Sequence, residues 1–214
     1  YKRQIFDQPG AKTNSRMIGR GSAVWNWYSV NTIIQYNQAT SIRGILDSHG
    51  IHVDHHNENT FIQYNYMEDC EGGFVEILGD NETAVYRFNI SVNDGWRENP
   101  NWVNSNHTIW LSNTIGGEAG HESNNSFIYN NTVVVNRSSD PYRTAIDIRA
   151  NNTKIFNNIF YSINGSKIGG KQVRAEDDNL LMTNNLYHGN IDNRFKDLDE
   201  KVIYGDPSFY NEDL

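Results

Sequence analysis

The chain has little of what many folds and binding functions depend on. Its single cysteine, Cys70, cannot form an internal disulfide. No apolar run approaches the roughly 18 residues of a membrane-spanning helix, so no membrane span is expected. Lys and Arg number 18 against 26 Asp and Glu and form no cluster. This argues against a nucleic-acid partner, because proteins that bind nucleic acid neutralise phosphates with clustered basic side chains.

Hydrophobic residues are also scarce, at 37% of the chain, so a thick globular core is not expected. A solenoid needs only a thin column of apolar side chains, which each coil covers for the next. The 214 residues fit one domain, and they begin at Tyr1 with neither Met nor a signal-like stretch. We therefore interpret the sequence as a mature chain or a piece of a longer one.

A short phrase that ends in Asn recurs along the chain. It reads IIQYN at 33–37, FIQYN at 61–65, VYRFN at 85–89, FIYNN at 127–131, KIFNN at 154–158 and LMTNN at 181–185. Most of the closing asparagines lie roughly 24 to 28 residues apart, with one longer gap, and repetition at such a period is typical of a solenoid. The asparagines are expected to stack as a ladder that joins neighbouring coils through side-chain amides.

A second β-like run precedes each closing Asn by about a dozen residues, and Asn, Asp, Gly and Thr fill the turns between the runs. The pattern predicts an all-β fold in which parallel strands stack about 4.8 Å apart in about six coils. The spacing does not fit a propeller blade of four strands, and a sandwich would lack the repeat. One domain over 1–214 is expected, with long loop insertions near 93–106 and 113–125.

The chain resembles the right-handed parallel β-helix proteins, and most closely the bacterial β-helix repeat proteins found among carbohydrate-active enzymes. The recurring Asn phrase and the paired short strands carry the resemblance from about Gly21 to Phe209. The resemblance implies the fold strongly. It does not select one activity, since that group includes hydrolases, lyases, epimerases and members without an assigned activity.

Alternation along the first run of each coil predicts which side chains face outward. The inward positions are Val53, Ile77, Ile109, Leu111, Ile146 and Ile148. The outward positions then form a row of Asn26, His52 and Asp54, Glu76, Trp110, Asp147 and Arg149, and Arg174. One exposed face therefore collects carboxylates, a histidine, an indole and arginines.

Asp54 and Glu76 belong to adjacent coils, so their carboxylates are expected roughly 5 to 8 Å apart. Glycoside hydrolysis needs two carboxyl groups about 5 to 5.5 Å apart for retention or about 6.5 to 9.5 Å apart for inversion. Crowding two like charges raises one pKa and supplies a general acid. We predict Asp54 and Glu76 as the catalytic pair, with His52 beside them and Asp147 as a further candidate.

Substrate contacts are predicted from residues around this row. His55, Trp110 and Arg149 would position a sugar, and the two long loops would add Trp96, Trp102 and His121 as walls of a groove. The alternative is that Trp96 and Trp102 only hold their own loop against the coil. Trp25 and Trp27 are expected to pack at the end of the core.

The segment 48–57 contains four histidines and an aspartate, a composition that permits a transition-metal site. Its spacing matches no specific zinc pattern. A Ca²⁺ ion held by Asp54, Glu76 and turn carbonyls is the other possibility, because calcium takes oxygen ligands. The expectation is therefore either no cofactor or Ca²⁺.

Three functions follow as hypotheses. The first is a secreted, periplasmic or cell-surface enzyme that degrades a polysaccharide or oligosaccharide as a glycoside hydrolase. The second is a polysaccharide lyase or uronate epimerase, with His52 or His121 as base and Arg149 or Ca²⁺ neutralising the acid. The third is a β-helix that binds glycans or mediates adhesion without catalysis.

Overall fold

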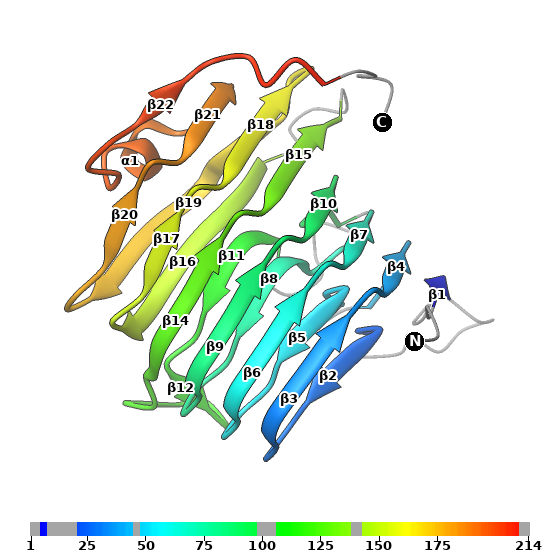
Figure 1. Cartoon of the computed structure of the whole chain (residues 1–214), viewed down its shortest axis with the longest axis vertical. Helices are drawn as coiled ribbons and strands as arrows, with labels where there is room; N and C mark the ends of the chain where they lie inside the picture. The colour runs from blue at the N-terminus through cyan, green and yellow to red at the C-terminus, as the bar shows by residue number, and fades with distance from the viewer. Residues whose placement is uncertain (1–4, 8–20, 45–47, 98–105, 138–142, 210–214) are drawn as a thin grey trace.

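The chain winds into a parallel β-solenoid of about six turns, which confirms the predicted parallel β-helix (Figure 1). The computed structural model describes residues 5–7, 21–44, 48–97, 106–137 and 143–209. In Figure 1 the coils rise from the blue N-terminal end to the orange and red C-terminal end. No helix in these residues is long and apolar enough to cross a membrane.

Three faces of parallel strands make up the solenoid; each of the six turns contributes one strand to each face, and β1 and β22 extend the third face at its two ends. The first face holds β2 (Val24–Asn26), β5 (Ile51–Val53), β8 (Gly73–Ile77), β11 (His107–Leu111), β16 (Arg143–Asn151) and β19 (Lys167–Asp177). The second face holds β3 (Val30–Gln35), β6 (Glu58–Gln63), β9 (Glu82–Arg87), β14 (Ser123–Tyr129), β17 (Lys154–Phe156) and β20 (Leu181–Thr183).

The third face is an eight-stranded parallel sheet. It holds β1 (Ile5–Asp7), β4 (Gln38–Thr40), β7 (Tyr66–Glu68), β10 (Ile90–Val92), β15 (Thr132–Asn136), β18 (Ile159–Ile163), β21 (Leu186–Gly189) and β22 (Ile203–Tyr204). A short helix, α1 (Asn193–Lys196), follows β21 and buries Phe195 against the core. A small antiparallel hairpin of β12 (Thr114–Ile115) and β13 (Glu118–Ala119) lies in the predicted loop insertion at 113–125.

Alternation assigned the core of the first face correctly. All of the predicted inward residues are fully buried, namely Val53, Ile77, Ile109, Leu111, Ile146 and Ile148. Two expectations at the N-terminal end were wrong. Asn26 faces inward, where its amide donates to the Thr60 hydroxyl at 2.8 Å. Trp25 and Trp27 do not complete the core, because they are 56% and 60% exposed.

The recurring asparagines form the predicted ladder. Each side-chain amide donates to the carboxamide oxygen of the next coil, at 2.9 to 3.1 Å, through Asn37, Asn65, Asn89, Asn131, Asn158 and Asn185. The ladder ends on a carboxylate, since Asn185 donates to Asp199 at 2.7 Å. These residues are structural, because their polar groups join one coil to the next.

Candidate functional site

One row of side chains crosses the first face from coil to coil. The register of the strands aligns Trp25, His52, Glu76, Trp110, Asp147 and Arg174. The predicted alignment is therefore confirmed from His52 onward, and Trp25 occupies the position that had been expected for Asn26. The predicted exposure of the row is wrong at His52 and Glu76, which are buried. Parallel strands at a fixed register thus bring together residues that are far apart in the sequence.

Glycine allows the strands that carry this row to approach closely. Gly73 has a φ of +136° and pairs with both His49 and His107. A β-carbon on Gly73 would lie 1.8 Å from the His107 carbonyl oxygen, and one on Gly72 would lie 2.6 Å from His49 Nδ1. Only glycine fits this corner, and the two imidazoles are brought to the site as a result.

A buried carboxylate lies between two imidazoles in the middle of the row. Oε2 of Glu76 is 2.7 Å from His49 Nδ1 and 2.9 Å from His52 Nδ1, and both Glu76 and His49 are fully buried. Burial alone would raise the pKa of Glu76, but attraction to His49 and His52 outweighs burial and lowers it well below its usual range. Glu76 Oε1 and His49 Nε2 have no hydrogen-bond partner among the described residues.

The two predicted catalytic carboxylates do not face each other directly. His52 lies between them, with Nδ1 near Glu76 and Nε2 3.9 Å from Asp54 Oδ2. Burial of Asp54 favours a higher pKa, but hydrogen bonds from His52 and the His55 backbone lower the pKa overall. Neither carboxyl has the raised pKa that the sequence argument expected, because the nearest charges are imidazoles rather than a second carboxylate.

The Asp147 end of the row opens into a cavity of about 340 Å³, here called the cationic trough. It is lined by His107, Trp110, Ala145, Asp147, Arg149, Lys171, Gln172 and Arg174. Arg149 lies 3.2 Å from Asp147 and also donates to Asn113 at 3.0 Å, and Arg174 lies 3.9 Å from Asp147. Two arginines therefore lie beside the Asp147 carboxylate and Lys171 adds a third cation to the lining, on a protein whose net charge is −8.

Burial shifts the titration of several groups in the trough. Burial raises the pKa of Asp147 in spite of the attraction of Arg149 and Arg174. It lowers the pKa of His107 to about 3, with further lowering from His49 and Lys171, so this imidazole is neutral at physiological pH. Burial, followed by repulsion from Arg97, also lowers the pKa of Lys171. The trough thus combines a carboxyl group with a raised pKa, a neutral ring and an amine that loses its proton more readily than usual.

Other predicted contact residues lie elsewhere. His55 contacts Asp54 at 3.5 Å, and His121 contacts Asp80 at 2.9 Å; neither lines the trough. Trp96 packs against the core and beneath the Arg137 guanidinium, 4.2 Å from the ring centre. This contact matches the alternative in which Trp96 holds its own loop. Trp102 lies outside the described residues.

Three residues of the site were not predicted from the sequence, namely His49, His107 and Lys171. Strict alternation would place His107 and Lys171 inward, since they share parity with Ile109 and Val173. The register shifts between His107 and Ile109 and again between Arg143 and Ala145 break this parity. A bulge leaves no clear mark in a single sequence, although the adjacent pairs Gly72–Gly73 and Gly169–Gly170 are local signals of an irregularity.

Metal binding has no direct support. Within the described parts of the chain, no group of three or more His, Cys, Asp or Glu side chains could hold a metal ion. The Ca²⁺ expected at Asp54 and Glu76 stays a prediction.

Comparison with protein-family models, with curated proteins and with solved structures gave no match. The functional assignment therefore depends on the geometry and charge of the first face.

Proposed function

We propose that this protein acts on an acidic polysaccharide at the cationic trough, as a lyase that cleaves next to a uronate. The observation that carries the proposal is the set of three cations, Arg149, Lys171 and Arg174, around one cavity of an otherwise acidic protein. Local positive charge attracts and orients an anionic sugar against the net charge of the chain. A substrate of this kind is an extracellular polymer, so the proposal includes a secreted, periplasmic or cell-surface location.

Each residue of the trough has its own role in a β-elimination. Arg149 and Arg174 bind the uronate carboxylate and stabilise the negative charge that develops when the neighbouring carbon loses its proton. The Lys171 amine takes that proton, and the electron pair forms a carbon–carbon double bond as the glycosidic carbon–oxygen bond breaks. Asp147, with its raised pKa, gives a proton to the leaving oxygen. The Trp110 ring packs against the sugar.

A glycoside hydrolase is the second candidate, and the raised pKa of Asp147 favours it because a general acid needs such a carboxyl. The originally predicted pair suits it less well. Glu76 is fully buried and its pKa is lowered, so it neither reaches a sugar nor holds a proton at neutral pH. Asp54 keeps partial exposure but lies beyond His52.

The test is to incubate the full chain with alginate, polygalacturonate, hyaluronan and chondroitin sulfate while recording ultraviolet absorbance and new reducing ends. The proposal expects absorbance from an unsaturated uronate with at least one of these polymers. Lys171→Ala should then lower kcat by about 100-fold or more, the usual effect of removing a general base. Arg174→Ala should mainly raise KM. Lys154→Ala, which removes a cation from the second face, is the matched control and should leave both constants unchanged.

Each other result has a definite meaning. Reducing ends without ultraviolet absorbance would replace the lyase with the hydrolase. Binding that depends on Arg174 but gives no product would assign the trough to a non-catalytic glycan-binding protein. Full activity in Lys171→Ala would remove Lys171 as the base.

A further inference from the structure

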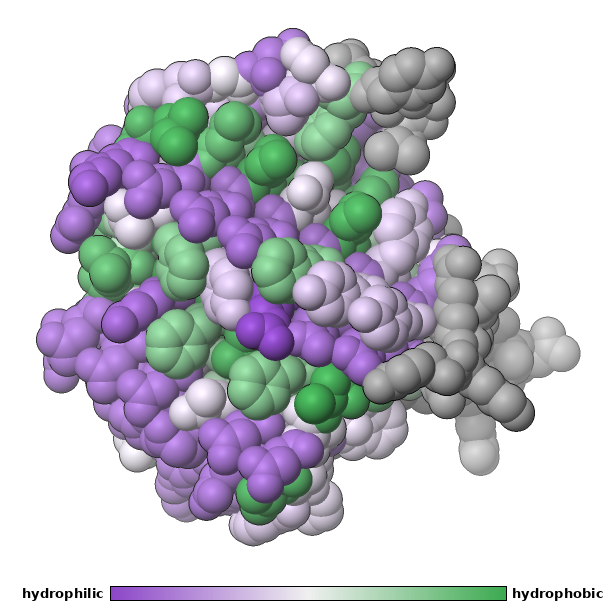
Figure 2. Space-filling model, viewed as in Figure 1, coloured by the Kyte–Doolittle hydropathy of each residue, from purple (hydrophilic) through white to green (hydrophobic). Residues whose placement is uncertain are grey.

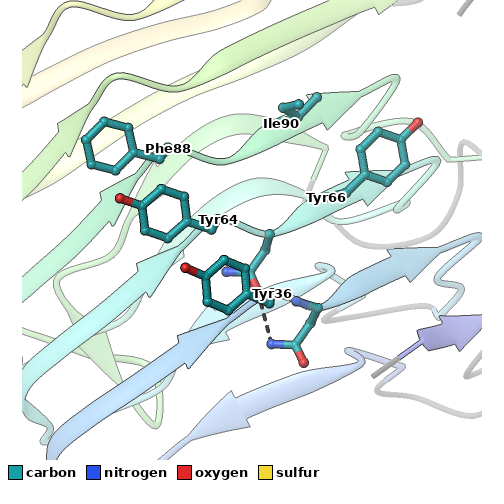
Figure 3. Close-up of a pocket in the computed structure, with 7 residues that line it drawn as sticks. Tyr36, Tyr64, Tyr66, Phe88 and Ile90 are labelled. Atoms are coloured by element: carbon teal, nitrogen blue, oxygen red, sulfur yellow. Dashed lines mark hydrogen bonds between the residues drawn. The ribbon is translucent and has the colours of Figure 1, made fainter. Parts of the chain in front are cut away.

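A second candidate site lies on another part of the solenoid, at the corner between the second and third faces. A groove there, with a volume of about 420 Å³, is lined by Tyr36, Asn37, Tyr64, Asn65, Tyr66, Phe88 and Ile90 (Figure 3). Three of these residues, Tyr36, Tyr64 and Phe88, hold equivalent positions in successive coils, each just before a ladder asparagine. We call these three side chains the aromatic platform.

The three rings of the platform are nearly parallel to one another. Tyr36 and Tyr64 have ring centres 5.4 Å apart with planes 10° apart, and Tyr64 and Phe88 have centres 5.0 Å apart with planes 4° apart. Parallel rings at these separations are offset, which leaves part of each face open. In Figure 3 the three rings follow one another from strand to strand and are turned the same way. The next pair, Phe88 and Tyr129, is near perpendicular at 73°, so the platform ends at Phe88.

The backbone beneath the platform disfavours aromatic residues. Tyr36, Tyr64 and Phe88 have φ values of 59°, 55° and 54°, in the left-handed region where a side chain crowds its own backbone. The three following coils place Asn130, Asn157 and Asn184 at this position, and asparagine tolerates the conformation best after glycine. The first three coils therefore carry bulky rings where the fold favours asparagine.

Burial does not account for these rings, because Tyr36, Tyr64 and Phe88 are 48%, 44% and 38% exposed. Ring-to-ring packing offsets part of the strain, but it does not require the rings to face solvent. Apolar side chains on the face seen in Figure 2 gather in clusters between hydrophilic ones. Strained residues with exposed aromatic rings indicate a binding surface.

We propose that the aromatic platform binds an uncharged stretch of glycan, with the sugar chain lying along the solenoid axis. None of the described residues that line the groove is Asp, Glu, Lys, Arg or His. Charges of opposite sign lie at its border, with Arg87 5.9 Å from the Phe88 ring centre and Glu68 accepting from the Tyr66 hydroxyl at 3.1 Å. The groove therefore favours a neutral ligand, unlike the cationic trough. The spacing of the rings is close to the advance of one pyranose unit in an extended chain, so one sugar stacks per coil. The Tyr64 hydroxyl at the groove donates a hydrogen bond to a sugar hydroxyl, while the Asn37 and Asn65 amides stay engaged in the ladder.

The test is affinity gel electrophoresis of the full chain in gels that contain hydroxyethyl cellulose, xyloglucan, galactomannan or laminarin. We expect at least one of these neutral polymers to retard the protein. Tyr64→Asn combined with Phe88→Asn should weaken the binding about tenfold or more, because rings that anchor a ligand dominate its affinity. The variant should fold, since asparagine is the residue that later coils use at this position, and circular dichroism and thermal unfolding check this.

Two controls make the result specific. Tyr204→Asn removes an exposed tyrosine from β22, outside the groove, and should bind as the unmodified chain does. Arg174→Ala empties part of the cationic trough and should also leave neutral-glycan binding unchanged, which keeps this proposal independent of the lyase proposal.

The proposal is overturned if none of the four polymers retards the folded protein, or if the double variant is retarded as strongly as the original. Sedimentation velocity tests whether a second copy of this chain, rather than a glycan, occupies the groove. A concentration-dependent dimer that the double variant abolishes would identify the groove as an interface between two copies of this chain, and would also overturn glycan binding.

Discussion

At the scale of single residues, two buried carboxyl groups show how neighbouring side chains set the direction of a pKa shift. Glu76 lies against two imidazoles, and its pKa is lowered. Asp94 is also buried, and it accepts hydrogen bonds from the neutral Ser91 hydroxyl at 2.6 Å and the Cys70 amide at 2.8 Å. Burial therefore dominates and raises the pKa of Asp94 to about 7 from its usual 3.8. Glu76 and Asp94 carry the same ionisable group, so the opposite directions of their pKa shifts come from their neighbours.

The raised pKa of Asp94 predicts a pH-dependent stability. Between about pH 4 and pH 7 the folded state binds this proton more tightly than the unfolded state does, so the free energy of unfolding falls as pH rises. Asp94→Asn keeps an acceptor for the Cys70 amide without the charge. We expect the substitution to raise the unfolding midpoint at pH 8 and to change it little at pH 4.

Thermal unfolding followed by circular dichroism at both pH values measures this difference. Equal midpoints for the variant and the original chain at pH 8 would mean that the buried Asp94 carboxylate carries no penalty. The neighbouring Asp69 is the control position, because Arg43 pairs with it at 2.5 Å. Asp69→Asn should not show the same gain at pH 8.

At the scale of elements, the asparagine ladder links each turn to the next. Asn131 is buried, accepts from the backbone and side-chain amides of Asn89 at 3.0 Å, and donates to the Tyr86 carbonyl at 2.9 Å. The bond from the Asn89 backbone amide satisfies a group that lies between β9 and β10, outside the strands. The same position is held in other coils by Asn89 and Asn158, so the ladder sets the register of the strands on either side.

Removing one member of the ladder should be costly. Asn131→Ala removes the acceptor of the Asn89 backbone amide and of one Asn89 side-chain N–H, and it removes a donor to the Tyr86 carbonyl. The Asn89 side chain keeps its bond to the Ile62 carbonyl. Each buried group left unsatisfied costs about 1 to 3 kcal/mol. We expect the free energy of unfolding to fall by about 3 kcal/mol or more in urea titration. Asn130→Gly, one residue away, is the control, because Asn130 is exposed at a φ of 53° that glycine also adopts. A loss below about 1 kcal/mol in Asn131→Ala would contradict this role for the ladder.

At the scale of the whole molecule, the solenoid is a linear array in which each coil contacts its neighbours. Interior coils are covered on two sides. The strands β2 and β3 are the two terminal strands of the first sheet, and β22 is a terminal strand of the other. Stability should therefore vary along the axis, and the cationic trough spans β11, β16 and β19 in the C-terminal half.

Native-state hydrogen exchange should show this gradient. We expect the backbone amides of β9 and β14 to exchange more slowly than those of β2 and β22, because opening an end coil breaks one interface and opening a central coil breaks two. Mass spectrometry of peptides from each coil measures the rates. Uniform protection from β2 to β22 would instead mean that the coils unfold as one cooperative unit.

The sequence by itself determined the fold and most of the row on the first face. Repetition of the Asn phrase predicted the coils and the ladder, and alternation placed Val53, Ile77 and their equivalents inward. Both patterns are local, because side-chain direction in a strand follows from the pleat and the stacking follows from the period. The repeat period and the alternation together predicted that Glu76, Trp110, Asp147 and Arg174 align from coil to coil.

Only the tertiary structure decided which members of that row can reach a substrate and what charge they carry. Two bulges moved His107 and Lys171 to the outer side, and a glycine corner brought His49 against Glu76. These contacts buried the carboxylate expected to be catalytic and left the cavity beside Asp147. Burial and pKa depend on neighbours from several coils at once, and a pattern read along a single strand does not contain that information.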